Sequence, residues 1–289
     1  MKDKIIAYQG IQGAYSHLAY KNVFPHSQAI ACETFQDAMH LVENGEADLA
    51  MIPIENSTAG RVEEIYRLIP KMSLHILDEH FEAVTHCLLA LKGVKIEDIK
   101  YVSSHPQALA QCHIKLSGYN FEPIAKFDTA GAAQELIQIN DKQHAAVASS
   151  LAAKLYNLEI LVDDFGDFQG NTTRFLILSK QSMVPKYEKD NSYITSLVFN
   201  VRNIPSSLYK ALGGFATNGI NLVKLESYSM TGSMKASQFH VDIDGHTDEK
   251  ELQLALDELR FFANEVKILG VYKRNPYRDK MKTLDLDEE

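Results

Sequence analysis

Residues 48–57 of this 289-residue sequence read DLAMIPIENS. The apolar run 49–54 predicts a buried strand, and the polar residues Glu55, Asn56 and Ser57 predict a turn at its end. Apolar residues at helical spacing follow between positions 62 and 68. A strand, a polar turn and a helix in this order form the repeating unit of α/β domains.

The same unit recurs over the first 180 residues. Further strands are expected at residues 5–8, 84–91, 101–103, 121–127, 145–148 and 173–178. Helices are expected to begin at polar residues, namely Ser16, Thr34, Ser104, Asp128 with Thr129, and Ser149 with Ser150. Such turns direct helix N–H groups toward the carboxyl ends of the strands, which favours anion binding. Two sets of these units predict two lobes with a ligand in the cleft between them.

The last third of the chain follows another pattern. Strands and helices are expected in the order βαββαβ, a ferredoxin-like module, over residues 194–272. A polar linker at 181–193 separates this module from an α/β domain of two lobes at residues 3–180, and a polar tail is expected at 273–289.

Composition excludes several classes of function. The formal net charge is -9, and no cluster of Lys and Arg offers a basic face, so we expect no nucleic-acid partner. The 3 cysteines have no CxxC spacing, which argues against disulfides and a thiolate zinc site. No apolar run long enough to span a membrane and no signal peptide is evident, so we expect a soluble, cytoplasmic protein without a membrane partner.

Motifs for common catalytic devices are also missing. The 11 histidines include no HExxH pair, no Gly-x-Ser-x-Gly occurs, and the turn from Gly10 to Gly13 lacks the spacing of a nucleotide-binding loop. We therefore expect no metal, no cofactor and no covalent intermediate.

What remains is a set of neutral hydrogen-bonding residues beside one arginine. The set is Asn56, Ser57, Ser104, Gln111, Thr129, Thr172, Thr173 and Arg174. Ser104 and Gln111 are two helical turns apart, so both can face one cleft. Each residue also has a plain structural explanation, as a helix cap or an ordinary strand residue. Spacing alone indicates a two-lobed binder or enzyme for a small anion.

Four longer strings resemble the prephenate dehydratase family, in the order and spacing of that family. They are Gly10-Ile11-Gln12-Gly13-Ala14-Tyr15-Ser16-His17, Pro53-Ile54-Glu55-Asn56-Ser57, Ser104-His105-Pro106-Gln107 with Gln111-Cys112, and Asn171-Thr172-Thr173-Arg174-Phe175. Residues 194–272 resemble the ACT regulatory domain of the family. The resemblance implies a fold like that of periplasmic binding proteins, no cofactor, a homodimer or homotetramer, and prephenate as substrate.

The resemblance also implies roles for the polar residues. Thr173 is expected to donate to the departing hydroxyl group, and Arg174 to hold the pyruvyl carboxylate of the substrate. The substrate-binding residues are expected to be Asn56, Ser57, Ser104, Gln111 and Thr129.

The module at 194–272 departs from the ACT pattern at two motifs, where it reads Ser206-Ser207-Leu208 and Glu226-Ser227-Tyr228-Ser229. We still expect L-phenylalanine to bind there as an inhibitor, near Leu208, Asn221, Leu222, Glu226 and Ser227. The alternative is a domain that only holds an oligomer together.

Three other readings of the whole chain stay open at this point. Arogenate, which carries an ammonium where prephenate has a ketone, is a near-isosteric substrate. A non-catalytic protein that binds or senses a small anion is a second reading. The effector region of a transcription regulator is a third, although no helix-turn-helix segment is evident.

Overall fold

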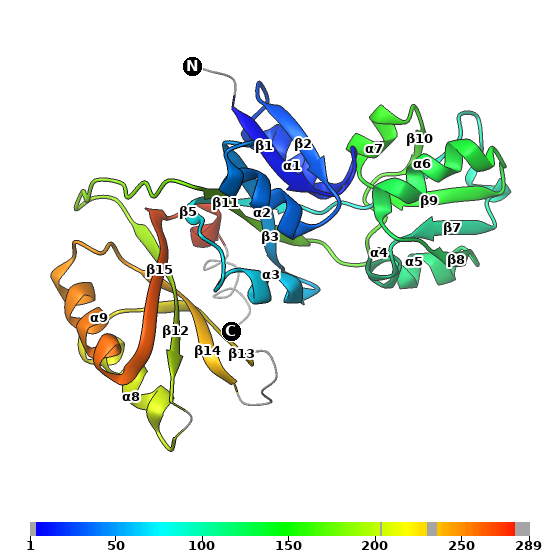
Figure 1. Ribbon diagram of the computed structural model, residues 1–289. Helices are drawn as coiled ribbons and strands as arrows, with labels where there is room; N and C mark the ends of the chain where they lie inside the picture. The colour runs from blue at the N-terminus through cyan, green and yellow to red at the C-terminus, as the bar shows by residue number, and fades with distance from the viewer. Residues whose placement is uncertain (1–3, 203, 230–235, 281–289) are drawn as a thin grey trace. The chain divides into compact units, whose positions relative to one another are not determined.

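The computed structural model describes residues 4–202, 204–229 and 236–280 (Figure 1). These residues form two compact units. Among them, no helix is long and apolar enough to cross a membrane.

The two units share the chain in an interleaved way. The first comprises the residues up to Ile65 and His80–Phe175, and the second comprises Tyr66–Glu79 and the residues from Leu176 onward. Helix α3 (Glu63–Leu68) and strands β5 (His75–Ala83) and β11 (Thr172–Ser179) therefore each run from one unit into the other.

The first lobe of the first unit is built on a sheet with the strand order β2-β1-β3-β11-β5, and β4 pairs with β3. Its other elements are β1 (Ile5–Gln9), α1 (Tyr15–Val23), β2 (Gln28–Cys32), α2 (Phe35–Asn44), β3 (Leu49–Asn56), β4 (Gly60–Arg61) and α3 (Glu63–Leu68). Strand β1 pairs in parallel with β2 and β3, as strand–helix–strand units require. The buried strand expected at residues 49–54 is β3. Thr34 caps α2 by accepting from the Asp37 N–H, and Gly45 ends the helix with a φ of 79°.

The second lobe has the strand order β10-β6-β9-β7-β8. Its elements are β6 (Cys87–Ala90), a 3₁₀ turn (Ile96–Asp98), β7 (Tyr101–Ser104), α4 (Pro106–Gln111), α5 (His113–Gly118), β8 (Glu122–Ala125), α6 (Thr129–Ile139), β9 (His144–Ala148), α7 (Ser150–Leu155) and β10 (Glu159–Val162). Asp128 and Ser149 cap α6 and α7 through their side chains, in line with the sequence pattern.

Ser104 does not cap α4, which corrects the expectation from sequence. It is the last residue of β7, and its hydroxyl donates to the Val147 carbonyl at 2.6 Å. His105 is the cap instead, with its ring nitrogen accepting from the Gln107 N–H at 3.2 Å. Because the residue before Pro106 favours an extended backbone, the strand runs one residue further than the cap pattern predicts.

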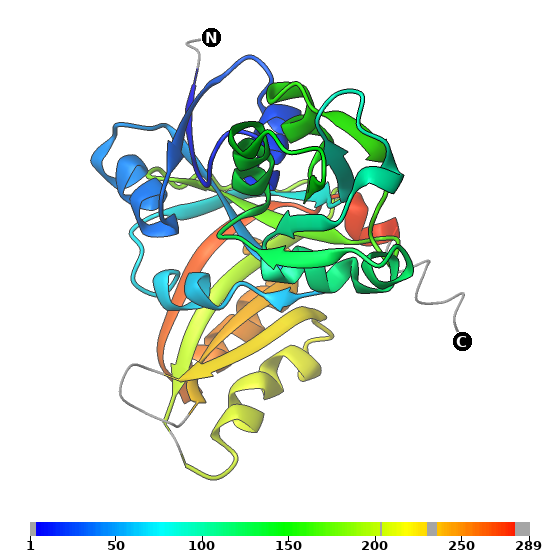
Figure 2. The ribbon, with the colours of Figure 1, turned by 90° about the vertical axis from the view of Figure 1, so that its right-hand side faces the viewer.

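The second unit contains the expected βαββαβ module. Its elements are β12 (Tyr193–Val201), α8 (Ser207–Thr217), β13 (Leu222–Ser229), β14 (Ala236–Asp244), α9 (Lys250–Phe262) and β15 (Ala263–Lys273), with the strand order β13-β14-β12-β15. The pairs are antiparallel, and α8 and α9 cover one face of the sheet (Figure 2). Alternate strand residues such as Phe199, Phe239 and Val241 form the core beneath these helices.

The segment 66–79 belongs to this second unit, although the sequence places it inside the domain at 3–180. The Tyr66 ring packs edge-on against the Tyr228 ring, with their centroids 6.0 Å apart. The centroid of the His240 ring lies 5.7 Å from that of Tyr66. The Lys267 ammonium donates to the Pro70 carbonyl at 3.4 Å. Contacts with residues more than 150 positions away thus decide the boundary, and local composition carries no sign of them.

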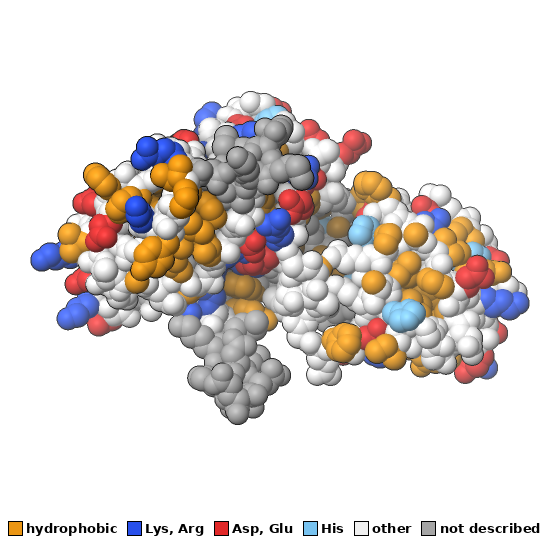
Figure 3. All heavy atoms as spheres, turned by 90° about the horizontal axis from the view of Figure 1, so that it is seen from below, with side chains coloured by type: hydrophobic (Ala, Val, Ile, Leu, Met, Phe, Trp, Pro, Cys, Tyr) orange, Lys and Arg blue, Asp and Glu red, His pale blue; other side chains and the backbone are white. Residues whose placement is uncertain are grey.

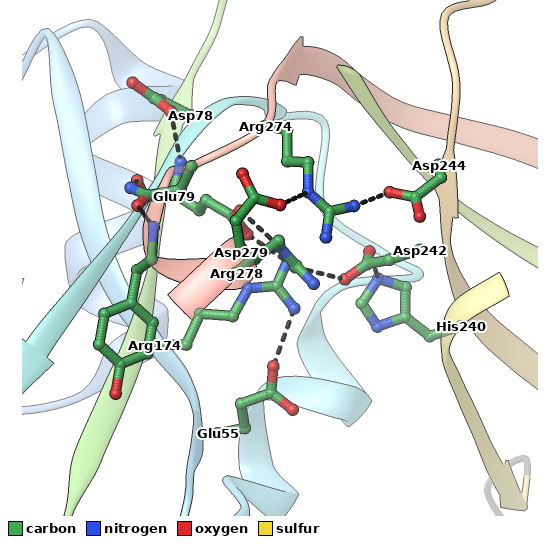
Figure 4. A network of polar contacts seen from close by, with 12 residues as sticks. Glu55, Asp78, Glu79, Arg174, His240, Asp242, Asp244, Arg274, Arg278 and Asp279 are labelled. Atoms are coloured by element: carbon green, nitrogen blue, oxygen red, sulfur yellow. Dashed lines mark hydrogen bonds and ion pairs between the residues drawn. The ribbon is translucent and has the colours of Figure 1, made fainter. Parts of the chain in front are cut away.

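The polar tail expected at 273–289 is described up to residue 280, and this part makes specific contacts that the sequence did not predict. The Arg278 guanidinium forms two hydrogen bonds with the buried Glu79 carboxylate, at 2.6 and 2.8 Å (Figure 4). Arg278 also lies 3.4 Å from Asp242, and Arg274 forms an ion pair with Asp244. The segment 274–280 is therefore fastened to the second unit, and the rest of the tail lies outside the described residues.

Two adjacent glycines in α8 test the packing of α8 on α9. A Cβ at Gly214 would lie 2.7 Å from the Glu258 Cβ, whereas a Cβ at Gly213 would meet no atom within 4 Å. Gly213→Ala should leave the free energy of unfolding unchanged or raise it by up to about 1 kcal/mol, since alanine favours the helix. Gly214→Ala should lower it by roughly 1–3 kcal/mol through overpacking. Urea unfolding followed by circular dichroism measures both, and equal effects would contradict this packing.

Candidate active site

A pocket of about 340 Å³ lies within the first unit and is lined by residues from both lobes. Strands β3, β4 and β11 of the first lobe contribute Asn56, Arg61 and Thr173, while the second lobe contributes Gln111 from α4 and Thr129 from α6. Polar side chains thus converge from segments far apart in the sequence, as expected for a small-molecule site.

Asn56 has only one possible amide orientation. Its side-chain oxygen accepts from the backbone N–H groups of Thr58 and Ala59, at 3.0 and 2.9 Å. The amide nitrogen therefore faces the other way, and it donates to the Thr173 hydroxyl oxygen at 3.0 Å and to the Asn171 side-chain oxygen at 2.7 Å. Because Thr173 accepts from Asn56, its own hydrogen is available to the pocket.

Gln111 receives two hydrogen bonds at its side-chain oxygen. Asn171 donates from its amide at 3.1 Å, and the His86 Nε2 atom lies 2.7 Å away. The other ring nitrogen of His86, Nδ1, lies 2.9 Å from the Tyr15 hydroxyl. Sequence patterns did not indicate His86, which falls in the strand expected at 84–91. Asn171 and Tyr15 belong to the quoted motifs, but no role was predicted for either.

Burial sets the charge of the two ring systems at this end of the pocket. It lowers the pKa of His86 and raises the pKa of Tyr15 well above its usual value. At neutral pH the imidazole is therefore uncharged and the phenol keeps its hydrogen. The lining also contains Arg61 and Asp128, and each has a local partner, Glu63 at 2.7 Å for Arg61 and the Gly131 N–H at 2.6 Å for Asp128.

Arg174 is not in the pocket wall, which corrects the role expected from its sequence. Neighbouring residues of a strand point to opposite faces, so Thr173 and Phe175 line the pocket while Arg174 faces away. The Arg174 guanidinium is 2% exposed and forms an ion pair with Glu55 at 2.8 Å (Figure 4). This pair joins the end of β3 to β11, directly behind Asn56 and Thr173.

Two of the predicted serines also lie outside the pocket lining. Ser104 is fully buried and ties β7 to β9 through the Val147 carbonyl. The Ser57 hydroxyl donates to the Gly170 carbonyl at 3.3 Å and accepts from the Thr172 N–H at 3.0 Å. Both serines therefore position the strand ends that carry the pocket residues. Among the residues that the structure describes, no group of three His, Cys, Asp or Glu side chains could hold a metal ion.

The profile of the family described as "Prephenate dehydratase" matches residues 6–183, which is more than half of the chain.

The chain belongs to the prephenate dehydratase family.

Similarity to individual proteins extends beyond the residues of this match and covers more than nine tenths of the chain. It is 44% identical over 279 residues to "Bifunctional N-acyl-homoserine lactone acylase/prephenate dehydratase" of Komagataeibacter europaeus, covering 96% of this chain and 99% of that protein. It is 41% identical over 276 residues to "Arogenate dehydratase/prephenate dehydratase 2, chloroplastic" of Arabidopsis thaliana, covering 92% and 72%. A solved prephenate dehydratase from Arthrobacter aurescens, in complex with L-Phe, matches with 30% identity and a TM-score of 0.86, covering 93% and 90%.

These matches confirm the α/β fold. As a member of the prephenate dehydratase family, the chain carries the Thr-Arg-Phe string on β11 with the threonine toward the pocket. The arginine that sequence alone would select as the anion partner supports the strand from behind instead.

The residues expected to bind an effector all lie in the second unit. Leu208, in the first turn of α8, and Leu222, at the start of β13, pack against the same apolar core. The Asn221 amide donates to the Asp244 carboxylate at 3.0 Å. Glu226 and Ser227 follow on β13, which is an edge strand of the sheet.

Proposed function

We propose that this family member converts prephenate to phenylpyruvate, the step that leads to L-phenylalanine. The observation that carries the proposal is the Thr173 hydroxyl, which faces the pocket and already accepts from Asn56. It is held as a donor, and the reaction needs a donor at the leaving hydroxyl group.

The chemistry balances without a cofactor. The bond between ring C1 and its carboxylate breaks, CO₂ leaves, and the electron pair enters the ring. The C4–O bond breaks, and the departing hydroxide takes a proton to become water. Thr173 is too weak an acid to protonate a resting alcohol, but its hydrogen bond strengthens as negative charge develops on the oxygen. Solvent then replaces any proton that Thr173 has given.

Substrate charge is met by groups other than Arg174. Arg61 on the β4 hairpin is the cation in the pocket wall, whereas the N-terminus of α6 is already capped by the Asp128 carboxylate. We assign the pyruvyl carboxylate to Arg61, with Thr129 as a neutral hydrogen-bonding neighbour. The ring carboxylate is better left beside the apolar wall of Pro53, Val84 and Phe175, because pairing it with a cation would hold back the loss of CO₂.

We further propose that the second unit is an ACT-like domain that binds L-phenylalanine and joins copies of the chain. Three features support this: the βαββαβ order, the relative whose structure contains L-Phe, and apolar side chains on the surface of the unit. Tyr209, Leu254 and Phe261 are exposed there. Figure 3 shows one face of the molecule, on which hydrophobic side chains gather in places. Such a surface is suited to association with a second copy.

Thr173→Val should lower kcat by about 10²–10⁴-fold at nearly unchanged KM for prephenate, because the hydroxyl acts mainly in the transition state. Valine has the same shape, so the strand should be kept. Thr173→Ser, which retains the hydroxyl, is the matched control and should stay within about tenfold of the parent. Formation of phenylpyruvate, followed by absorbance, measures both. A loss below about threefold in Thr173→Val would remove Thr173 as the donor.

The two arginines should separate binding from stability. Arg61→Met should raise KM by about tenfold or more, and should change the free energy of unfolding by less than about 1 kcal/mol, since its ion pair is exposed. Arg174→Met should lower the free energy of unfolding by roughly 3 kcal/mol, because Glu55 loses a buried partner. Steady-state kinetics and urea unfolding of both variants check this. If Arg174→Met instead raised KM and Arg61→Met did not, the pyruvyl carboxylate of the substrate would be assigned to Arg174.

L-phenylalanine should bind to the full-length active enzyme, and should bind more weakly once the pocket holds a substrate analogue. The reason is that coupling between two sites is reciprocal. Isothermal titration with and without the analogue measures this. If no binding heat appears at millimolar phenylalanine, the second unit serves association alone.

A further inference from the structure

Five side chains around the pocket are joined by hydrogen bonds in the order Asn56, Asn171, Gln111, His86 and Tyr15. Hydrogen bonds have a direction, since each needs one donor and one acceptor. An amide side chain offers both, so its orientation is normally open to choice. In this chain of bonds the choice is removed at one end.

The fixed end is Asn56. Backbone N–H groups can only donate, and two of them donate to the Asn56 side-chain oxygen. Asn56 must then present its nitrogen to Asn171, whose facing atom must be oxygen. The nitrogen of Asn171 therefore faces Gln111, and the facing atom of Gln111 must also be oxygen.

His86 completes the sequence. The Gln111 oxygen is an acceptor, so the His86 Nε2 atom, 2.7 Å away, must carry a hydrogen. At Nδ1, the ring lies 2.9 Å from the hydroxyl oxygen of Tyr15, which donates its single hydrogen to the Thr85 carbonyl at 2.9 Å. Burial lowers the pKa of His86, so the ring keeps one hydrogen, and the Gln111 oxygen requires that hydrogen on Nε2. His86 is 3% exposed and both of its nitrogens have partners, so the ring is held in place.

With its oxygen held by two donors, the Gln111 amide nitrogen is left to face the pocket. This side of the pocket therefore presents donors and suits a substrate group that accepts. A ketone or carboxylate oxygen satisfies it, whereas an ammonium, which only donates, leaves buried donors unpaired.

We propose that His86, with Asn171, is a positioning residue that turns the Gln111 amide nitrogen toward the substrate, and that the resulting donor surface selects the keto acid prephenate over the amino acid arogenate. This inference rests on the proposed function and names the substrate class of the same site. Asn171 stands between Gln111 and the Asn56–Thr173 pair in the chain of bonds. We accordingly place Gln111 against the side chain of the substrate and not against its leaving hydroxyl.

The test replaces the hydrogen-bond donor of residue 111 with an acceptor and leaves the size of the side chain unchanged. In Gln111→Glu, one carboxylate oxygen still accepts from His86 and Asn171, while the other replaces a donor with an acceptor. The parent should favour prephenate over arogenate by at least about tenfold in kcat/KM, and the variant should lower that ratio by about tenfold or more. The added negative charge disfavours the carboxylates of both substrates alike and also attracts the ammonium of arogenate, so the uncharged variants of His86 are needed to separate hydrogen-bond polarity from charge.

Two variants of His86 test the positioning role. His86→Leu removes one of the two donors that hold the Gln111 oxygen and should lower the ratio in part, because Asn171 alone then holds the amide less firmly. His86→Gln supplies an N–H to Gln111 and should restore most of the parent ratio. A merely structural His86 would change the melting temperature and the two kcat/KM values together, and would leave their ratio unchanged.

The outcomes separate the inference from the function on which it rests. If the parent enzyme does not turn over prephenate, the proposed function fails. If it turns over prephenate but Gln111→Glu changes the ratio by less than about twofold, or the parent favours arogenate, only the donor-surface inference is overturned. Should His86→Leu fail to fold, the Gln111→Glu result decides together with that of His86→Gln.

Discussion

The side-chain oxygen of Asn56 accepts two backbone N–H groups of its own turn, and this local constraint orders the polar wall of the pocket. Because the oxygen is occupied, the nitrogen must serve both Thr173 and Asn171. Thr173 becomes a donor to the pocket for the same reason that Gln111 does. Partly buried amides would otherwise have two orientations of similar energy, and an active site with two polarities would bind substrate in only one of them.

The ion pair between Arg174 and Glu55 supports this arrangement from the opposite face of the strand. Glu55 precedes Asn56 on β3, and Arg174 follows Thr173 on β11. The two residues that work in the pocket are thus each next to a residue that holds the strands together. A dianionic substrate would compete with Glu55 for Arg174 if both lay in the pocket, so the separation of faces keeps the support independent of the ligand.

Strands β5 and β11 connect the pocket with the second unit through the chain itself. Strand β11 contains Thr173 and continues into the second unit at Leu176. Strand β5 contains Glu79, which Arg278 holds within the second unit, and the chain reaches His86 shortly after β5 ends. Both strands thus link residues near the pocket to the second unit along the chain.

The parts of the structure that the sequence predicts are those decided by neighbours in the chain. The caps at Thr34 and Asp128, the helix end at Gly45 and the βαββαβ order all depend on residues within a few positions or on the period of a strand or helix. Asn56, Gln111, Thr129 and Thr173 were also found from sequence, and the structure brings them to one pocket.

Tertiary structure alone decided which polar residues line the pocket. Ser104 and Arg174 have partners 43 and 119 residues away, so no local pattern indicates that their polar groups are used internally. Because strand residues alternate between faces, Thr173 and Arg174 do not both face the cleft, although both were expected from the sequence to meet the substrate. No sequence pattern indicated a role for His86, because its two side-chain partners, Tyr15 and Gln111, lie 71 and 25 residues away in the chain. Hydrogen-bond direction is a property of the assembled contacts, which is why the sequence determined the donors and acceptors and the fold determined where each one points.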